Sequence, residues 1–178
     1  MKKMAMTIIL ILALATAAAI FLNRHRQAVG VEQLGVVVSP GGRIAVYHPG
    51  DRPLVIPGLQ HFLLLSAKPL RYLLTDANSV VVSSVDKKPV TVGCLVRYQV
   101  EDPAKLVARQ GFNAPQAAIE ALIKNQVVGA LNNTLQRGSV SLDDTQTRII
   151  LVGSVHEALR LALEPSGIKI LDFDLISW

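Results

Sequence analysis

The most regular alternation of apolar and polar positions lies between Ser79 and Val107. From residue 90 to residue 100 every second side chain is apolar, and Leu95 is the only large apolar residue at the intervening positions. A period of two in β-branched residues is typical of a half-buried strand. A second β-branched run precedes the polar turn at 86–89 (DKKP), so the pattern predicts a hairpin. The side chains expected on its buried face are Val90, Val92, Cys94, Val96, Tyr98 and Val100.

Helical signals begin directly after this hairpin. Asp102 can cap a helix through its side chain, and Pro103 suits the first helical position. We therefore expect a short helix over 103–110 that ends at Gly111.

Two longer helices are expected next. Apolar residues at steps of three and four predict a helix over 114–136, capped by Asn113 and ended by Gly138. A capping-box pattern at 141–144 precedes a third helix over 143–164. The apolar stripe of the second helix comprises Ile119, Leu122, Ile123, Val127, Ala130, Leu131, Thr134 and Leu135, and that of the third comprises Ile149, Val152, Leu159 and Leu163.

Pro165 and Gly167 end the third helix and lead into a final strand over 168–176. Its alternation places Leu171, Phe173 and Leu175 opposite Asp172 and Asp174. Earlier in the chain, strands are expected over 31–38, 43–48, 61–65 and 70–74, and the first two are joined by a Ser-Pro-Gly-Gly turn. Strands followed by helices and one last strand indicate an α+β domain, with helices on one side of a mostly antiparallel sheet.

The segment 4–22 stands apart because it contains nineteen residues without a charge. This length suits a transmembrane helix, and Arg24 and Arg26 follow it as a stop at the membrane surface. A cleaved secretory signal remains the alternative, since small residues occur at 15–17. The expected organisation is an anchor with its basic flank over 1–26 and one domain over 27–178. Cations on both sides of the segment nearly balance, so orientation stays open.

Composition narrows the functional classes. The net charge is +5, but Lys and Arg are scattered and only eight aromatic residues are present, so nucleic-acid binding has little support. The single cysteine, Cys94, excludes an internal disulfide and lies on the apolar side of its strand, where it is expected to be a core residue.

The sequence shows no catalytic or metal-binding arrangement, and we expect neither an enzyme nor a cofactor. The four histidines are scattered without ligand spacing. Ser154 and His156 would lie on different faces of their helix, and Asp172 and Asp174 are expected to form a solvated polar face. The four histidines are His25, His48, His61 and His156.

Four motifs follow one another along residues 31–178: EQLGV at 32–36, PGLQHF at 57–62, VRYQVEDP at 96–103 and SGIKI at 166–170. With these motifs in this order, residues 31–178 resemble the stomatin/prohibitin/flotillin family, called SPFH or Band 7. The segment 32–36 (EQLGV) resembles the first strand of the family, and 57–62 (PGLQHF) resembles its PG-x-H-F element. Two later elements also resemble those of the family: the hairpin ending at 96–103 (VRYQVEDP) and the strand beginning at 166–170 (SGIKI). The closest likeness is to short, membrane-anchored bacterial members of the prohibitin type.

This resemblance implies a scaffold held at a membrane, in bacteria the inner membrane, by a single N-terminal span. It also implies homo- or hetero-oligomers with SPFH proteins, and modulation of a membrane protease of the AAA+ class. Arg24 and Arg26 are expected to contact lipid head groups. A second segment expected to contact the membrane interface is the apolar loop that contains Pro57, Gly58, Leu59, Phe62 and Leu63. Packing of this loop at the edge of the core is an alternative of equal weight.

The sequence differs from the family pattern after the last strand, where relatives usually continue into a long helical coil. Assembly through such a coil is therefore in doubt for the residues present. The alternative function, from a different class, is an exported α+β domain that binds a ligand or partner after signal cleavage.

Overall fold

The computed structural model describes residues 2–75, 78–83, 89–111, 115–137 and 145–177. The chain folds into two compact units, Met1–Leu64 and Leu65–Trp178. The expected turn at 86–88, the cap at Asn113, the helix stop at Gly138 and the capping box at 141–144 lie outside the described residues. The boundary expected after residue 26 stays a prediction.

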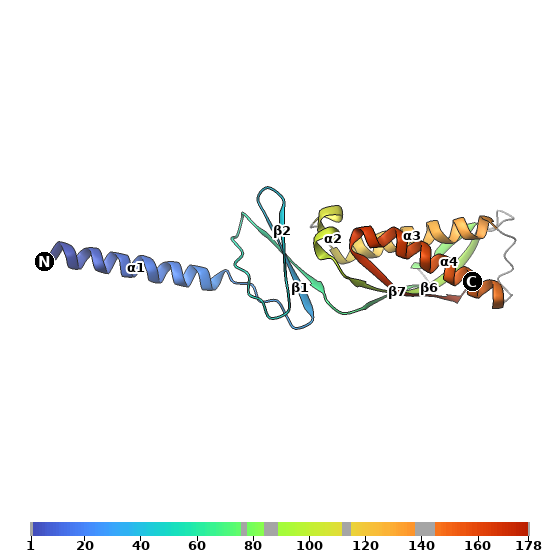
Figure 1. The fold of residues 1–178 in the computed structure, drawn as a ribbon, viewed down its shortest axis with the longest axis horizontal. Helices are drawn as coiled ribbons and strands as arrows, with labels where there is room; N and C mark the ends of the chain where they lie inside the picture. The colour runs from blue at the N-terminus through green and yellow to red at the C-terminus, as the bar shows by residue number, and fades with distance from the viewer. Residues whose placement is uncertain (1, 76–77, 84–88, 112–114, 138–144, 178) are drawn as a thin grey trace. The chain divides into compact units, whose positions relative to one another are not determined.

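The first unit contains helix α1 (Lys2–Arg24) and a small antiparallel sheet in the order β2-β1-β3 (Figure 1). Its strands are β1 (Gln33–Ser39), β2 (Arg43–Tyr47) and β3 (His61–Ser66), the last of which continues into the second unit. β1 begins two residues later than expected because the chain turns at 31–32, and Val31 is 87% exposed. β2 ends at Tyr47, one residue earlier than expected.

Close packing fixes the middle of β1. Val36 and Val37 are buried, and Gly35 lies where a side chain would come within 2.7 Å of a Val29 methyl group and 3.1 Å of the Phe62 ring. A glycine is required here because interiors are too closely packed to accept an extra carbon atom without rearrangement.

The second unit is organised around the twelve-residue strand β6 (Pro89–Val100). It pairs antiparallel with β4 (Leu70–Leu74), β5 (Val80–Ser83) and β7 (Ile168–Ser177). The expected hairpin is confirmed by the β5–β6 pairing. The alternation is confirmed as well: Val92, Cys94, Val96, Tyr98 and Val100 are all at most 3% exposed, and Val90 is half-buried.

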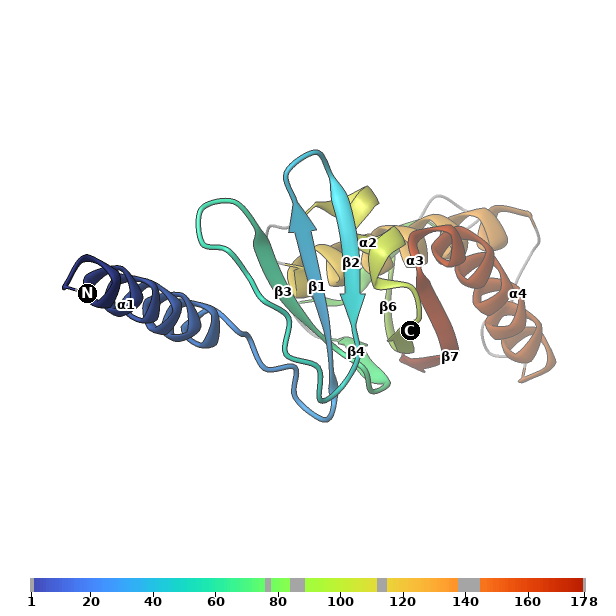
Figure 2. The same cartoon turned by 60° about the vertical axis from the view of Figure 1, so that its left-hand side comes forward.

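Helices cover the buried face of this sheet (Figure 2). α2 (Pro103–Gln110) has the bounds expected from the sequence, and the backbone N–H of Lys105 donates to Asp102 Oδ1 at 3.1 Å. This hydrogen bond lowers the pKa of the Asp102 carboxyl group. The cap predicted at Asp102 is therefore confirmed.

The long helices α3 (Pro115–Arg137) and α4 (Thr145–Leu163) pack against each other, α3 against β5 and α4 against β7. The stripe expected on α3 is confirmed, with Leu122 and Thr134 half-buried at its margin. Gln116 Nε2 on α3 donates to the hydroxyl oxygen of Tyr98 at 2.8 Å, which satisfies the polar end of a buried ring. Burial raises the pKa of this phenol.

The stripe expected on α4 is wrong at two positions. Ile149 is 65% exposed and Val152 is half-buried, so neither belongs to the core. The run 149–152 is apolar on every side of the helix, so the pattern could not identify the buried face. The residues that the structure buries follow a spacing of four and are Leu151, Val155, Leu159 and Leu163.

The face expected for the last strand is also wrong at one position. Tyr98 pairs with Ile170 and Arg97 with Asp172, so Leu171 is an extra residue in β7 without a partner on β6. Such a bulge reverses the alternation on one side. Ile170 therefore enters the core, while Leu171 is 36% exposed. Asp172 and Asp174 are exposed, as expected.

The turn from α4 into β7 is held against the turn from β6 into α2. A 3₁₀ turn, Glu164–Ser166, ends at Gly167, whose φ is 74°. The carbonyl oxygen of Gly167 accepts the backbone N–H groups of Glu101 and Asp102, at 2.9 and 3.1 Å. Two connections that are distant in the sequence are thereby joined through one glycine.

We predict that Gly167→Ala destabilises the chain far more than Gly111→Ala. Both glycines have a positive φ, near 75°, which costs an alanine about 1–3 kcal/mol. Only at Gly167 would the new carbon atom also overlap the carbonyl of Asp102, and this should add about 2 kcal/mol. Urea unfolding of both variants measures the difference, and equal losses would contradict the described contact.

We also predict that Cys94 is inert in the folded chain. Burial raises the pKa of its thiol to about 12, so at pH 8 only about one thiol in ten thousand is ionised. Labelling with a chromogenic disulfide reagent should be slow in buffer and complete within minutes in urea. Rapid labelling of the native chain would show that the sheet opens at Cys94.

Candidate membrane-facing surface

The apolar side chains of α1 are exposed on every side of the helix. Residues of this type normally lie inside a protein, and a helix that is apolar all round is found in a protein core or in lipid. Nine large apolar residues of α1 are between 44% and 76% exposed, namely Met6, Ile9, Leu10, Ile11, Leu12, Leu14, Ile20, Phe21 and Leu22.

The expected transmembrane span is not confirmed. Within the part of the chain that the structure describes, no helix meets the combined length and hydropathy required to cross a membrane.

The end of α1 leads directly into a ladder of backbone hydrogen bonds between residues 25–29 and residues 51–55. His25 still donates its N–H to Phe21, and its carbonyl oxygen accepts from Val55 at 2.9 Å. Next along the chain, the N–H of Gln27 donates to the carbonyl of Pro53 at 3.0 Å. The ladder continues through the N–H of Val29, which donates to the carbonyl of Asp51. No free linker therefore separates the helix from the segment 51–55.

This ladder places an apolar loop directly after the segment bonded to the helix end. A turn forms at Pro57-Gly58, with the N–H groups of Leu59 and Gln60 both directed to the carbonyl of Ile56. The Gln60 side chain accepts from the N–H of Ile56 at 2.9 Å and donates to Ser39 at 3.0 Å. The loop is thus held in a defined conformation, with Leu59 59% exposed at its tip.

The residues expected to contact the membrane interface fall into two groups. Pro57, Gly58 and Leu59 are exposed. Phe62 and Leu63 are half-buried on β3, and the Phe62 ring packs near Gly35. Phe62 therefore contributes to the core of the first unit as well.

Leu54 and Ile56 are two further exposed apolar residues beside the ladder, each 36% exposed, that were not predicted from the sequence. No apolar–polar alternation marks these two residues in the sequence, because residues 53–56 are all apolar and only the structure shows that Pro53 and Val55 are buried. The prolines at 53 and 57 also identify the segment as irregular.

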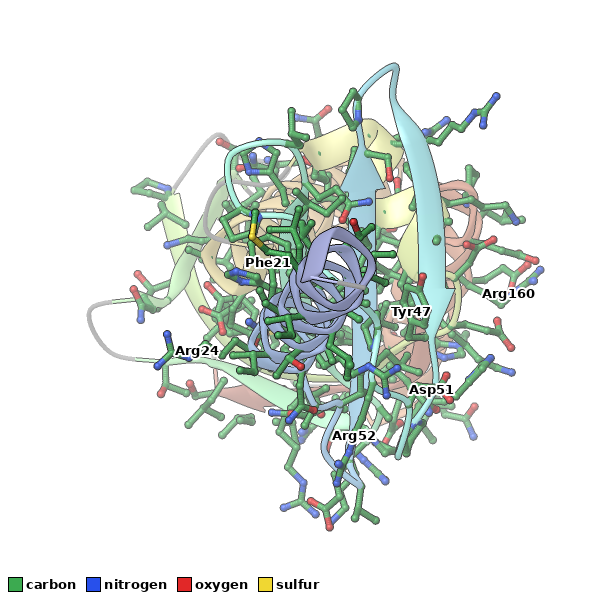
Figure 3. All side chains as sticks on the ribbon, turned by 90° about the vertical axis from the view of Figure 1, so that its left-hand side faces the viewer. Phe21, Arg24, Tyr47, Asp51, Arg52 and Arg160 are labelled. Atoms are coloured by element: carbon green, nitrogen blue, oxygen red, sulfur yellow. The ribbon has the colours of Figure 1, made fainter. Side chains whose placement is uncertain are left out.

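Arg24 and Arg26 lie at the end of α1 and are both exposed. Figure 3, which looks along the helix, shows Arg24 reaching away from it. Arg26 lines a surface hollow of about 300 Å³ together with Ala19, Leu22 and Asn23. The first unit holds six Lys and Arg against two Asp and Glu, so it carries four of the five net positive charges.

Figure 3 also shows Tyr47, Asp51 and Arg52 gathered where β2 leads into the ladder. The Asp51 carboxylate accepts the backbone N–H of His48 at 2.8 Å, which fixes this turn. Arg52 is exposed, so it adds to the positive charge of this unit.

Charged side chains around a pocket of the second unit form ion pairs with one another. A pocket of about 390 Å³ in the second unit is lined by Glu101, Arg160, Glu164, Lys169 and Ile170. Its Arg160 pairs with Glu164 and its Lys169 with Glu101, both at 3.2 Å. Among the residues with described positions, no cluster of His, Cys, Asp and Glu could hold a metal ion.

Comparison with known proteins identifies the family of the chain. A model of the SPFH domain / Band 7 family matches residues 27–177, and proteins of this family are in general membrane-associated scaffolds without enzymatic activity. A search of curated proteins finds no match to the chain. Because the family model covers nearly everything that follows α1, the chain belongs to the SPFH domain / Band 7 family.

Proposed function

We propose that this chain is a scaffold attached to a membrane through α1, which inserts into the bilayer as a single-pass anchor. The observation that carries the proposal is the exposed apolar surface of α1, joined without a linker to a second exposed apolar segment at 54–59. Lipid is an environment in which both surfaces lose contact with water.

The energy available is sufficient for attachment. Moving a largely exposed Leu or Ile side chain out of water gains roughly 1.5–3 kcal/mol. With nine such residues on α1, the total is well above the binding energy of one acyl chain, which gives only marginal, reversible attachment. The loop residues Leu54, Ile56 and Leu59 would add to this energy at the membrane interface, with Pro57 and Gly58 shaping the turn.

The basic residues at the helix end would strengthen binding to anionic lipid. Each Lys or Arg near a negatively charged leaflet contributes about 1 kcal/mol, and salt screens this attraction. Arg24 and Arg26 suit this role because they are exposed at the point where the apolar helix ends. The hollow beside Arg26 offers space for a head group.

We further propose that copies assemble at the membrane, alone or with other SPFH proteins, and modulate a membrane protease of the AAA+ class. The family supports this proposal, together with the ability of a shared membrane to strengthen weak contacts between anchored copies. The bacterial inner membrane is the location that we propose.

We predict that the full chain floats with lipid vesicles and that the double variant Ile11→Lys, Leu14→Lys does not. Each lysine at the centre of a bilayer costs about 2.5–3.5 kcal/mol. Val31→Lys is the matched control, because Val31 is exposed and apolar but lies outside α1. Mass spectrometry of the membrane fraction should show an intact N-terminus. A soluble chain shortened by about seventeen to twenty residues would instead establish the exported-domain alternative.

We also predict that Arg24→Gln, Arg26→Gln weakens binding to vesicles containing anionic lipid by about tenfold or more at low salt. The same variant should bind neutral vesicles as the unmodified chain does, and the difference should shrink in about 0.5 M salt. Arg43→Gln, an exposed arginine of the same unit in β2, serves as the control. An equal loss for this control would assign the effect to net charge and not to the helix end.

A further inference from the structure

The sheet of the second unit has a second face, opposite the one that α3 and α4 cover. We call it the outer sheet face and define it by two rows of residues across β4, β6 and β7. The rows, as aligned by the strand register, are Arg71, Arg97, Asp172 and Leu73, Leu95, Asp174. Between these positions, Val96 on β6 and Phe173 on β7 are buried in the core, and Tyr72 on β4 is half-buried.

Apolar residues are exposed on and around the outer sheet face. Leu73 is 51% exposed, and Val81, which pairs with Thr91 on the same side of β6, is 59% exposed. The two bulge positions of β7 hold Leu171 and Ile176, which are 36% and 49% exposed. Neighbouring exposed apolar residues of this kind on a sheet mark an interaction surface.

The charges on the outer sheet face are divided between its two edges. Arg97 and Asp172 approach to 4.0 Å in the centre. Within the described chain, Arg71 on the β4 edge and Asp174 on the β7 edge form no ion pair. One face therefore presents an unpaired cation at one edge and an unpaired anion at the other.

We propose that the outer sheet face binds the outer sheet face of a second copy of this chain. A twofold axis that lies between the two sheets, parallel to them and perpendicular to the diagonal from Arg71 to Asp174, would pass over β6 between Arg97 and Leu95. It would place Arg71 of each copy over Asp174 of the other. The same axis brings Leu73 and Leu95 of the two copies together. A patch that is complementary to itself in this way is what a twofold interface requires.

The size of this face indicates a weak contact that depends on confinement. The five residues of β4 that pair with β6 extend over roughly 17 Å and three strands over roughly 14 Å, so the face covers about 240 Å². This is below the roughly 800 Å² per partner of a stable complex. The strength of the pairing, though not its geometry, thus rests on the proposed membrane attachment, which would raise the local concentration of copies.

Cross-linking of the full chain on vesicles tests the proposal. Stacked sheets lie about 10 Å apart, so Leu95→Cys should be joined to its counterpart by a bismaleimide with a spacer of about 10 Å. Ser154→Cys is the matched control, because Ser154 is exposed on α4, on the opposite side of the sheet. The native Cys94 is buried in both variants and should not react.

Charge reversal then identifies the contact. In the Leu95→Cys background, Arg71→Glu and Asp174→Arg should each lower the cross-linked fraction about fivefold, because like charges would face each other. Combining the two reversals restores opposite charges and should recover the cross-link. Circular dichroism of each variant verifies that the fold is retained.

Two results would overturn the pairing: equal cross-linking of the Leu95→Cys and Ser154→Cys chains, or a double reversal that fails to recover. Flotation of the same samples separates this outcome from a failure of membrane attachment. If the chain does not float, the proposed function is wrong. Cross-linking at high protein concentration in detergent, with the same variants, then decides the pairing by itself.

Discussion

The burial of every second side chain of β6 is the constraint on which the second unit depends. Five of these side chains, from Val92 to Val100, are almost completely removed from water. They form the middle of a layer that β4, β5 and β7 extend on both edges and that α3 and α4 cover. Once this face is fixed, the opposite positions must face outward, and the distribution of charges on the outer sheet face follows from the same alternation.

Local patterns of sequence predicted much of this fold. The β6 face, the hairpin and both ends of α2 were each determined by signals within a few residues, such as the Asp102-Pro103 cap. Errors occurred where the local pattern was ambiguous or interrupted. Four consecutive apolar residues at 149–152 fit either side of α4, and the bulge at Leu171 depends on pairing with a strand far away in the sequence.

The candidate membrane-facing surface was likewise predicted only where its signals are local in the sequence. Arg24, Arg26 and the tip at Leu59 could be named from the sequence because an apolar run with basic flanks and a Pro-Gly turn are both local. The ladder that joins residues 25–29 to residues 51–55 consists of backbone hydrogen bonds. Such bonds leave no trace in side-chain identity, so the sequence could not show that the helix end and the loop adjoin.

The pairing of β6 with β7 has a consequence for the order in which the second unit forms. Val100 meets Ile168, so this strand pair closes a loop of about seventy residues, at an entropic cost of roughly 4 kcal/mol or more. Helices α2, α3 and α4 lie inside that loop and consist mainly of local contacts, which form fastest. Their early folding would shorten the effective loop and bring Gly167 back toward Asp102, so the helices that cover the core also act as the spacer that guides β7 to its place.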